Sequence, residues 1–85
     1  RLGYNSTMPE IFRAFGLVLV IFPDDHAPPH THVFCGGEKC KIFLEGPRVA
    51  DKPRCTLPPS RLRKALLLVA ENRAILLQEW EKIHG

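Results

Sequence analysis

Residues 61–83 repeat apolar side chains at helical spacing, and this long amphipathic segment constrains the fold more than any other feature. Ser60 is the expected N-cap of the predicted helix, and Gly85 is a natural stop. The apolar residues that share one face are Leu62, Leu66, Val69, Leu76, Leu77, Trp80 and Ile83. The pattern therefore predicts one long C-terminal helix that docks on a core.

The chain ahead of this segment predicts strands. Residues 15–22 form a short apolar run rich in β-branched and aromatic side chains, which indicates a strand buried on both faces. Residues 31–35 and 39–44 are further strand candidates, with Gly36 and Gly37 as a tight turn between them. The proline-containing stretch 46–59 is expected to be a loop or a broken edge strand. We predict an α+β fold: a small antiparallel sheet of three to four strands with one long C-terminal helix packed on one face.

The length of 85 residues indicates a single small domain with a modest core, which a partner or a homodimer would help to stabilise. Residues 1–7 lack periodicity and precede Met8, so we interpret 1–7 as a leader or an upstream extension and 8–85 as the domain. No apolar run approaches the ~20 residues that span a membrane. We therefore expect no membrane partner.

The net charge of +3 hides an uneven distribution. Between positions 48 and 64 only Asp51 is acidic, whereas the basic residues there are Arg48, Lys52, Arg54, Arg61, Arg63 and Lys64. Concentrated positive charge is typical of surfaces that bind phosphates or acidic partners. A solvated basic surface that keeps a small protein soluble would leave the same pattern, so both interpretations stay open.

The loop 24–32 reads Asp-Asp-His-Ala-Pro-Pro-His-Thr-His and is the strongest candidate for a functional site. His30 and His32 are two positions apart at the start of a predicted strand, so their side chains point to the same face. The two prolines ahead of them restrict the backbone and stiffen the loop. The two aspartates could orient an imidazole or raise its pKa.

Three kinds of chemistry suit this loop. His26, His30 and His32, with Asp25, could act as general acid and base on an RNA phosphodiester, where the ribose 2′-hydroxyl is the nucleophile. The same histidines, alone or with an aspartate, could instead bind a divalent metal. In the third interpretation they only hydrogen-bond the loop and fill the sheet face. Composition and spacing leave all three open.

The predicted helix carries the candidate phosphate-binding residues Arg61, Arg63, Lys64 and Arg73. Arg73 lies near the middle of the apolar face, where it must either extend its head into water or pair with an anion. Leu68 and Ile75 form a second apolar strip beside that face, which is either core or a surface for a partner.

The chain has three cysteines, Cys35, Cys40 and Cys55, an odd number with no obvious disulfide framework. Free buried thiols fit a reducing cytoplasm. A zinc site is the alternative, although no pair has the short Cys-x-x-Cys spacing of strong zinc motifs.

Several motifs together resemble a known family. They are Met8-Pro9-Glu10-Ile11, the string Asp25-His26-Ala27-Pro28-Pro29-His30-Thr31-His32, and Glu71-Asn72-Arg73 with Trp80. The chain from Met8 onward resembles DUF4160, a family of small bacterial proteins of unknown function that is grouped with DhiT-like toxins. Thr31 departs from the pattern, because an aromatic residue is usual between the two histidines, and Cys35 and Cys40 are not typical.

The resemblance implies a cytoplasmic bacterial protein encoded beside a small antitoxin partner in a type II toxin–antitoxin pair, with the histidine loop as its signature. It supplies no mechanism. We therefore expect a toxin-like component that acts on RNA through the rigid loop, without deciding whether it is an enzyme. The alternative is a non-catalytic module that docks a protein or nucleic acid through the Leu68/Ile75 strip or the basic segment, with a metal bound by the histidines.

Overall fold

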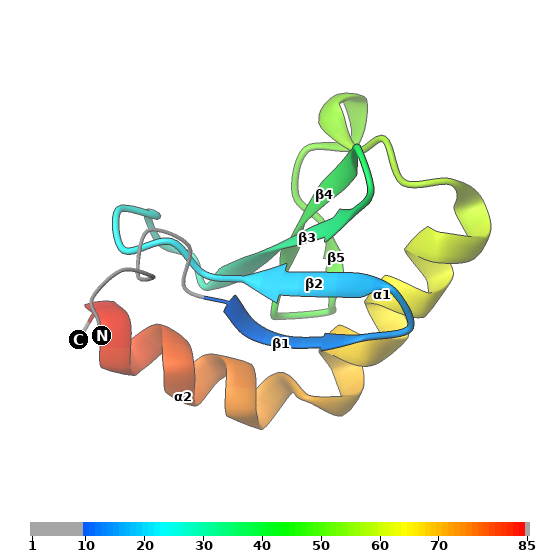
Figure 1. Cartoon of the computed structure of the whole chain (residues 1–85). Helices are drawn as coiled ribbons and strands as arrows, with labels where there is room; N and C mark the ends of the chain where they lie inside the picture. The colour runs from blue at the N-terminus through cyan, green and yellow to red at the C-terminus, as the bar shows by residue number, and fades with distance from the viewer. Residues whose placement is uncertain (1–9, 85) are drawn as a thin grey trace.

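The structure, a computed structural model, describes residues 10–84. Its five strands form one antiparallel sheet in the order of the sequence, β1-β2-β3-β4-β5, and two helices lie on one side of that sheet (Figure 1). The elements are β1 (Glu10–Ala14), β2 (Leu17–Val20), β3 (His30–Cys35), β4 (Glu38–Phe43), β5 (Arg48–Val49), a short 3-10 helix (Lys52–Arg54), α1 (Pro59–Glu71) and α2 (Arg73–His84). The predicted α+β class is confirmed.

The sheet has five strands, one more than the upper limit of the three to four predicted. The additional strand is β1, which precedes the apolar run and pairs with β2. The first two residues of that run, Phe15 and Gly16, form the turn between these strands. Their φ angles are 54° and 76°, and positive φ at both central positions is the geometry of a tight hairpin. The strand expected at 15–22 is therefore shorter than predicted.

The hairpin of β3 and β4 has the predicted turn at Gly36 and Gly37, and Cys35 pairs with Glu38. The stretch 46–59 contains β5, a two-residue edge strand, as predicted. This register fixes which side chains share a face with the histidines.

The predicted C-terminal helical segment is present, but it is interrupted at Asn72 and forms two helices instead of one. The Asn72 side-chain amide donates to the Leu68 carbonyl over 2.8 Å, and its backbone (φ −114°, ψ 19°) leaves helical geometry. Figure 1 shows α1 and α2 meeting there at an angle. The expected N-cap Ser60 is also wrong, since Pro58 is the N-cap. Among residues 10–84, neither helix is long and apolar enough to cross a membrane.

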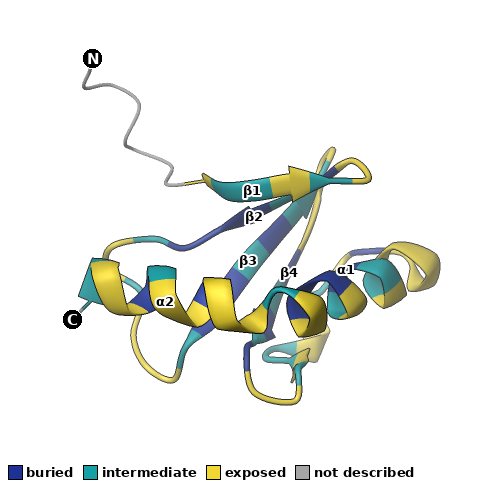
Figure 2. Ribbon diagram, turned by 90° about the horizontal axis from the view of Figure 1, so that it is seen from below, coloured by how far each residue is buried: buried dark blue, intermediate teal, exposed yellow. Residues whose placement is uncertain are grey.

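The core lies between the sheet and the helices, whose buried sides face the strands (Figure 2). Leu68 is only 5% exposed and belongs to this core, whereas Ile75 is 52% exposed. The bend at Asn72 separates the two residues. They do not form one continuous surface strip, so of the two docking surfaces predicted this one is absent.

The expectation that all three cysteines are free is wrong for two of them, because Cys40 and Cys55 form a disulfide. Lys39 and Thr56 hold their two segments together: the Thr56 N–H donates to the Lys39 carbonyl over 2.8 Å. Cys35 is the free thiol. The cysteine count alone is therefore not evidence for a reducing compartment.

Candidate functional site

The loop after β2 is held by hydrogen bonds at both ends. The Phe22 N–H donates to Asp25 Oδ2 over 2.9 Å, and the Asp25 N–H donates to the Phe22 carbonyl over 3.1 Å. Farther along, the Leu44 N–H donates to the Pro29 carbonyl over 3.1 Å. These bonds turn the Asp25 side chain, only 12% exposed, back toward the start of β3.

His32 is bound directly to this carboxylate. Its Nε2–H donates to Asp25 Oδ1 over 3.1 Å, which leaves Nδ1 as the basic nitrogen of the neutral ring. The ring meets the edge of Phe22 at a centroid distance of 4.9 Å. Next to it, Thr31 is buried, and its hydroxyl donates to the Val20 carbonyl over 3.0 Å. This bond helps to fix the register of β3 against β2. His32 itself is 25% exposed and reaches solvent.

His30 belongs to the same cluster but is nearly inaccessible, with a side chain 2% exposed. Its Nδ1–H donates to the Pro28 carbonyl over 2.8 Å. Burial lowers the pKa of His30, as do the nearby charges of Lys41 and His32, against the opposing effects of Pro28 and Asp25. The neutral ring then has its lone pair on Nε2, which lies 3.5 Å from Asp25 Oδ1.

Asp25 is held in its ionised form. Burial opposes ionisation, but it is outweighed by the hydrogen bonds from Phe22 and His32 and by the charges of His32 and His30, and the pKa of Asp25 falls below its ordinary value. The cluster therefore combines a carboxylate with two imidazoles, and only one of these rings reaches the surface.

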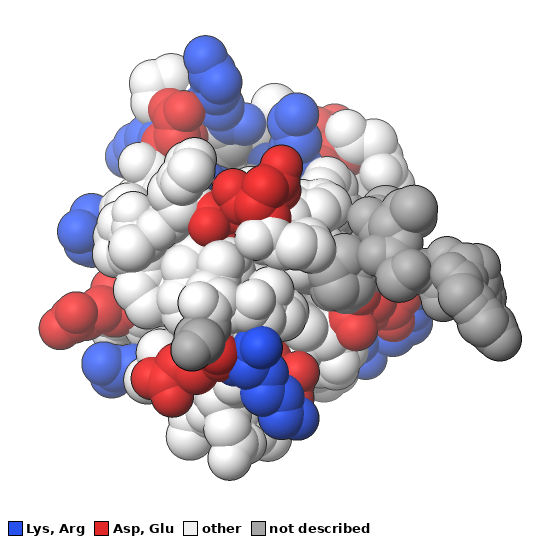
Figure 3. All heavy atoms as spheres, turned by 90° about the vertical axis from the view of Figure 1, so that its left-hand side faces the viewer, with Lys and Arg blue, Asp and Glu red and all other residues white. Residues whose placement is uncertain are grey.

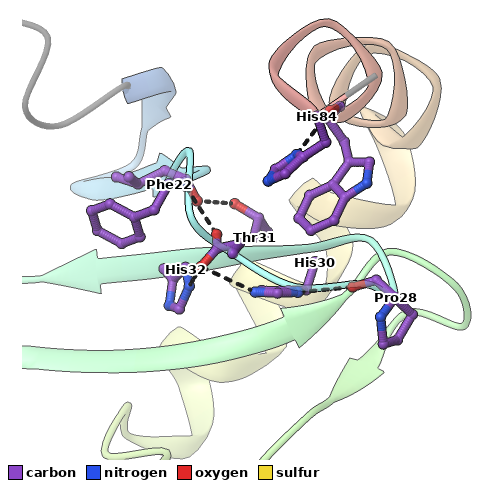
Figure 4. A network of polar contacts seen from close by, with 9 residues as sticks. Phe22, Pro28, His30, Thr31, His32 and His84 are labelled. Carbon is purple, nitrogen blue, oxygen red and sulfur yellow. Dashed lines mark hydrogen bonds and ion pairs between the residues drawn. The ribbon is translucent and has the colours of Figure 1, made fainter.

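A row of rings continues from this cluster to the end of α2. His30 lies 5.1 Å from His32 and 5.1 Å from Trp80, which in turn stacks on His84 at 3.9 Å. Figure 4 shows His30 and His32 side by side below the helix that carries His84. Helix packing thus helps to position the buried imidazole. Trp80 was predicted only as core, and sequence reasoning missed His84.

A pocket of about 370 Å³ opens beside His32. Two aromatic rings, those of Phe22 and Phe34, line this pocket. The rest of the lining is mostly basic and consists of Lys39, Lys41 and Arg54, together with Cys40 and Asp51. Lys41 is the strand partner of His32. We call this the His32 pocket. It places cations and stacking surfaces around the accessible imidazole.

A second pocket, of about 420 Å³, borders Pro28 and Pro29. It is lined by Arg73 and Arg48 together with Pro28, Pro29, Phe43, Leu44, Glu45, Gly46 and Leu77. The Arg48 guanidinium lies over the Phe43 ring at 4.5 Å. Arg73 is exposed and does lie beside the histidine loop, but it borders this second pocket rather than the His32 pocket.

The structure brings together Asp25, His30 and His32 of the predicted catalytic residues but leaves His26 exposed and outside the cluster. Asp25 takes the place expected for His26 in the candidate ligand set. The three candidate ligand atoms lie within 4.8 Å of one another, and no cysteine belongs to such a cluster among residues 10–84.

The predicted phosphate binders on α1 lie elsewhere. Arg61 donates to the Phe15 carbonyl over 3.2 Å, and the Lys64 ammonium lies 4.4 Å from the Phe15 ring centre. Arg63 is exposed. Sequence reasoning missed Lys39 and Lys41, although alternation along the hairpin places them on the face of His32.

The basic segment 48–64 does not form one broad patch. Arg48 lines one pocket and Arg54 the other, whereas Arg61 and Lys64 contact Phe15. Figure 3 shows the side of the molecule that carries the histidine loop and the end of α2: uncharged atoms occupy most of its middle, with Lys and Arg mostly around the border.

A family model described as "Domain of unknown function (DUF4160)" matches residues 16–81, from the turn before β2 to near the end of α2. The match includes the whole histidine cluster and both pockets. Comparisons with curated proteins and with solved structures find no match.

Proposed function

The chain belongs to the DUF4160 family, and we propose that it binds single-stranded RNA in the His32 pocket and cleaves it by acid–base catalysis. The observation that carries this proposal is the position of His32. Asp25 holds one ring nitrogen over 3.1 Å, and the ring lines a pocket rich in basic and aromatic side chains. A carboxylate that orients an imidazole in this way sets its tautomer and stabilises the imidazolium that forms during proton transfer.

The reaction we propose needs no nucleophile from the protein. His32 Nδ1 takes the proton of a ribose 2′-hydroxyl, and the 2′-oxygen attacks the adjacent phosphorus. The bond from phosphorus to the 5′-oxygen of the next nucleotide breaks, water protonates that oxygen, and a 2′,3′-cyclic phosphate remains. Lys41, opposite His32 on β4, is placed to stabilise the negative charge that develops on the phosphate oxygens.

The rest of the pocket suits a single strand. Phe34 offers a ring on which a base can stack, and such contacts are worth about 1–3 kcal/mol per base. Lys39 and Arg54 supply positive charge for the neighbouring phosphates. The pocket contains Asp51 as well, which lies 3.5 Å from Arg54 and keeps the lining from being wholly basic.

We place this activity in a toxin-like component of a bacterial type II toxin–antitoxin pair, with a small antitoxin as partner and the cytoplasm as the site of action. The support is the resemblance of the string from Asp25 to His32 to the DhiT-like toxins. Expression of the chain in a bacterium should arrest growth, and His32→Ala should relieve the arrest, whereas His26→Ala should not. A His32→Ala variant that is produced at the wild-type level and remains fully toxic would refute this role.

One observation favours a non-catalytic docking role as the second candidate. Ile75 and Leu77 on α2 are 52% and 37% exposed and border a shallow hollow with Ala74, Gln78 and Glu81. A partner bound there should be lost in Ile75→Asp and retained in His32→Ala. The opposite pattern would assign partner binding to the histidine loop.

A further inference from the structure

We infer that Asp25, His30 and His32 form a binding site for one divalent ion of the zinc class. Asp25 Oδ1 lies 3.1 Å from His32 Nε2 and 3.5 Å from His30 Nε2, and the three ligand atoms are all within 4.8 Å of one another. A tetrahedral ion with bonds of ~2.0–2.1 Å separates its ligands by about 3.3–3.4 Å. The two distances from the carboxylate oxygen bracket that separation.

The surroundings of His30 match those of a metal ligand. Metal-binding histidines donate their second ring N–H to a carbonyl or carboxylate, which fixes the tautomer and the direction of the free lone pair. His30 does this with the Pro28 carbonyl over 2.8 Å. Its Nε2 is thereby left as an acceptor that faces another acceptor, the Asp25 carboxylate. A cation between these two atoms would replace the repulsion between two acceptors with two coordination bonds.

Two histidines and one carboxylate are a common ligand set for zinc and other first-row divalent metals. Three protein ligands leave a fourth position open for water or another small ligand. The imidazole of His32 and its strand partner Lys41 both line the His32 pocket. The open coordination position would therefore be accessible from this pocket. The site lacks one histidine of the set that the sequence suggests, since exposed His26 takes no part.

The bound ion and the proposed cleavage compete for the same imidazole. An ion that occupies His32 Nε2 requires the ring proton to move to Nδ1, so the nitrogen that would accept the 2′-hydroxyl proton is no longer free. Zinc should therefore inhibit the cleavage. Only this consequence rests on the proposed function, because the ion site follows from the three ligand positions alone.

The site is tested by titrating metal-free, untagged wild-type protein with Zn²⁺ in a calorimeter and with Co²⁺ by visible absorption. We expect one ion per chain, a tetrahedral cobalt spectrum and a higher melting temperature in zinc. His32→Gln, at a partly exposed position, should weaken binding by about 100-fold or more, given that even outer partners of metal ligands contribute 10–100-fold. The matched controls His26→Gln and Cys35→Ser should bind as the wild type does.

The inference is overturned if the wild type binds no stoichiometric ion, or if His26→Gln weakens binding as much as His32→Gln does. An RNA assay on the same samples keeps the two proposals separate. Stoichiometric zinc without any RNA cleavage supports the ion site and rejects the proposed function, whereas cleavage without zinc binding does the reverse. Unchanged cleavage by zinc-loaded protein would refute the competition at His32.

Discussion

The Nε2 atom of His32 lies 3.1 Å from Oδ1 of Asp25, a residue seven positions earlier in the chain. The other carboxylate oxygen accepts the Phe22 N–H, so the same side chain closes the turn after β2 and orients the accessible imidazole. The loop geometry and the chemistry of the site therefore depend on one residue. This double role makes Asp25 the most informative position to change.

Asp25→Asn separates the two roles, because the amide oxygen can still accept the Phe22 N–H while the negative charge is lost. We expect the fold to persist and the rate constant for RNA cleavage to fall by about 10²-fold or more, within the range that general acid–base groups contribute. Single-turnover cleavage measures the effect, and far-UV circular dichroism checks the fold. Asp24→Asn, one residue earlier and exposed, is the control. Equal rates for both variants would remove Asp25 from the mechanism.

RNA binding should weaken when Lys39, Lys41 or Arg54 is changed to alanine, because these side chains line the pocket in which the phosphates are placed. Each lost phosphate contact should lower the dependence of log affinity on log salt by about 0.7, the value for single strands. Fluorescence anisotropy at several salt concentrations gives this slope. Arg63→Ala removes the same charge outside the pocket and should leave the slope close to that of the wild type. Identical slopes for all four variants would mean that RNA binds elsewhere.

Mild acid should destabilise the metal-free protein through His30. Its pKa in the folded state lies below the ordinary 6.5, mainly through burial, although Asp25 opposes this effect while Lys41 and His32 add to it. The unfolded chain therefore binds more protons as the pH falls below 6.5, so the free energy of unfolding decreases. This contribution is present in full above the unfolded pKa and is lost as the pH falls through the folded one.

Asp25 should lower the free energy of unfolding further at lower pH, because its pKa in the folded state lies below the ordinary 3.8. Urea unfolding at a series of pH values, with chelator present, measures both contributions. In His30→Gln the decrease near pH 6.5 should become smaller. A free energy of unfolding that stays level from neutral pH to about pH 4 would contradict this account.

The disulfide between Cys40 and Cys55 should stabilise the oxidised protein. The two residues are 15 positions apart, and closing a loop of that size restricts the unfolded chain by about 3 kcal/mol. Urea unfolding of Cys55→Ser should show a loss of that order, and a reducing agent should produce a similar loss in the wild type. Cys35→Ser is the control, since Cys35 is free. If reduction leaves the wild type unchanged, the disulfide contributes nothing to stability.

Local patterns in the sequence were enough to predict the α+β class, the β3–β4 hairpin and the pairing of His30 and His32 on one face. Each depends on residues close in the chain: strand alternation, a two-glycine turn and helical spacing. The same patterns could not show the bend at Asn72, because it depends on a side-chain amide that bonds to the Leu68 carbonyl. They also missed β1, which lies outside the apolar run.

The site was predictable only in part, for the same reason. The loop sequence identifies the candidate histidines, but the choice of Asp25 over His26 depends on how the turn at Phe22 directs each side chain. The buried state of His30 depends on Trp80, fifty positions away along the chain and 5.1 Å away in space. Charge clustering in the sequence favoured Arg61, Arg63 and Lys64, whereas strand register selects Lys39 and Lys41.

Cleavage of one single-stranded RNA by metal-free protein, with analysis of the ends produced, tests the central claim most directly. The account predicts 2′,3′-cyclic phosphate ends with chelator present, no cut in DNA of the same sequence, and a loss of about 10²-fold or more in His32→Ala, the scale of a general base. His26→Ala should cleave at the wild-type rate. Cleavage of the DNA, or a His32→Ala variant as fast as the wild type, would contradict the assignment of His32 as the base held by Asp25.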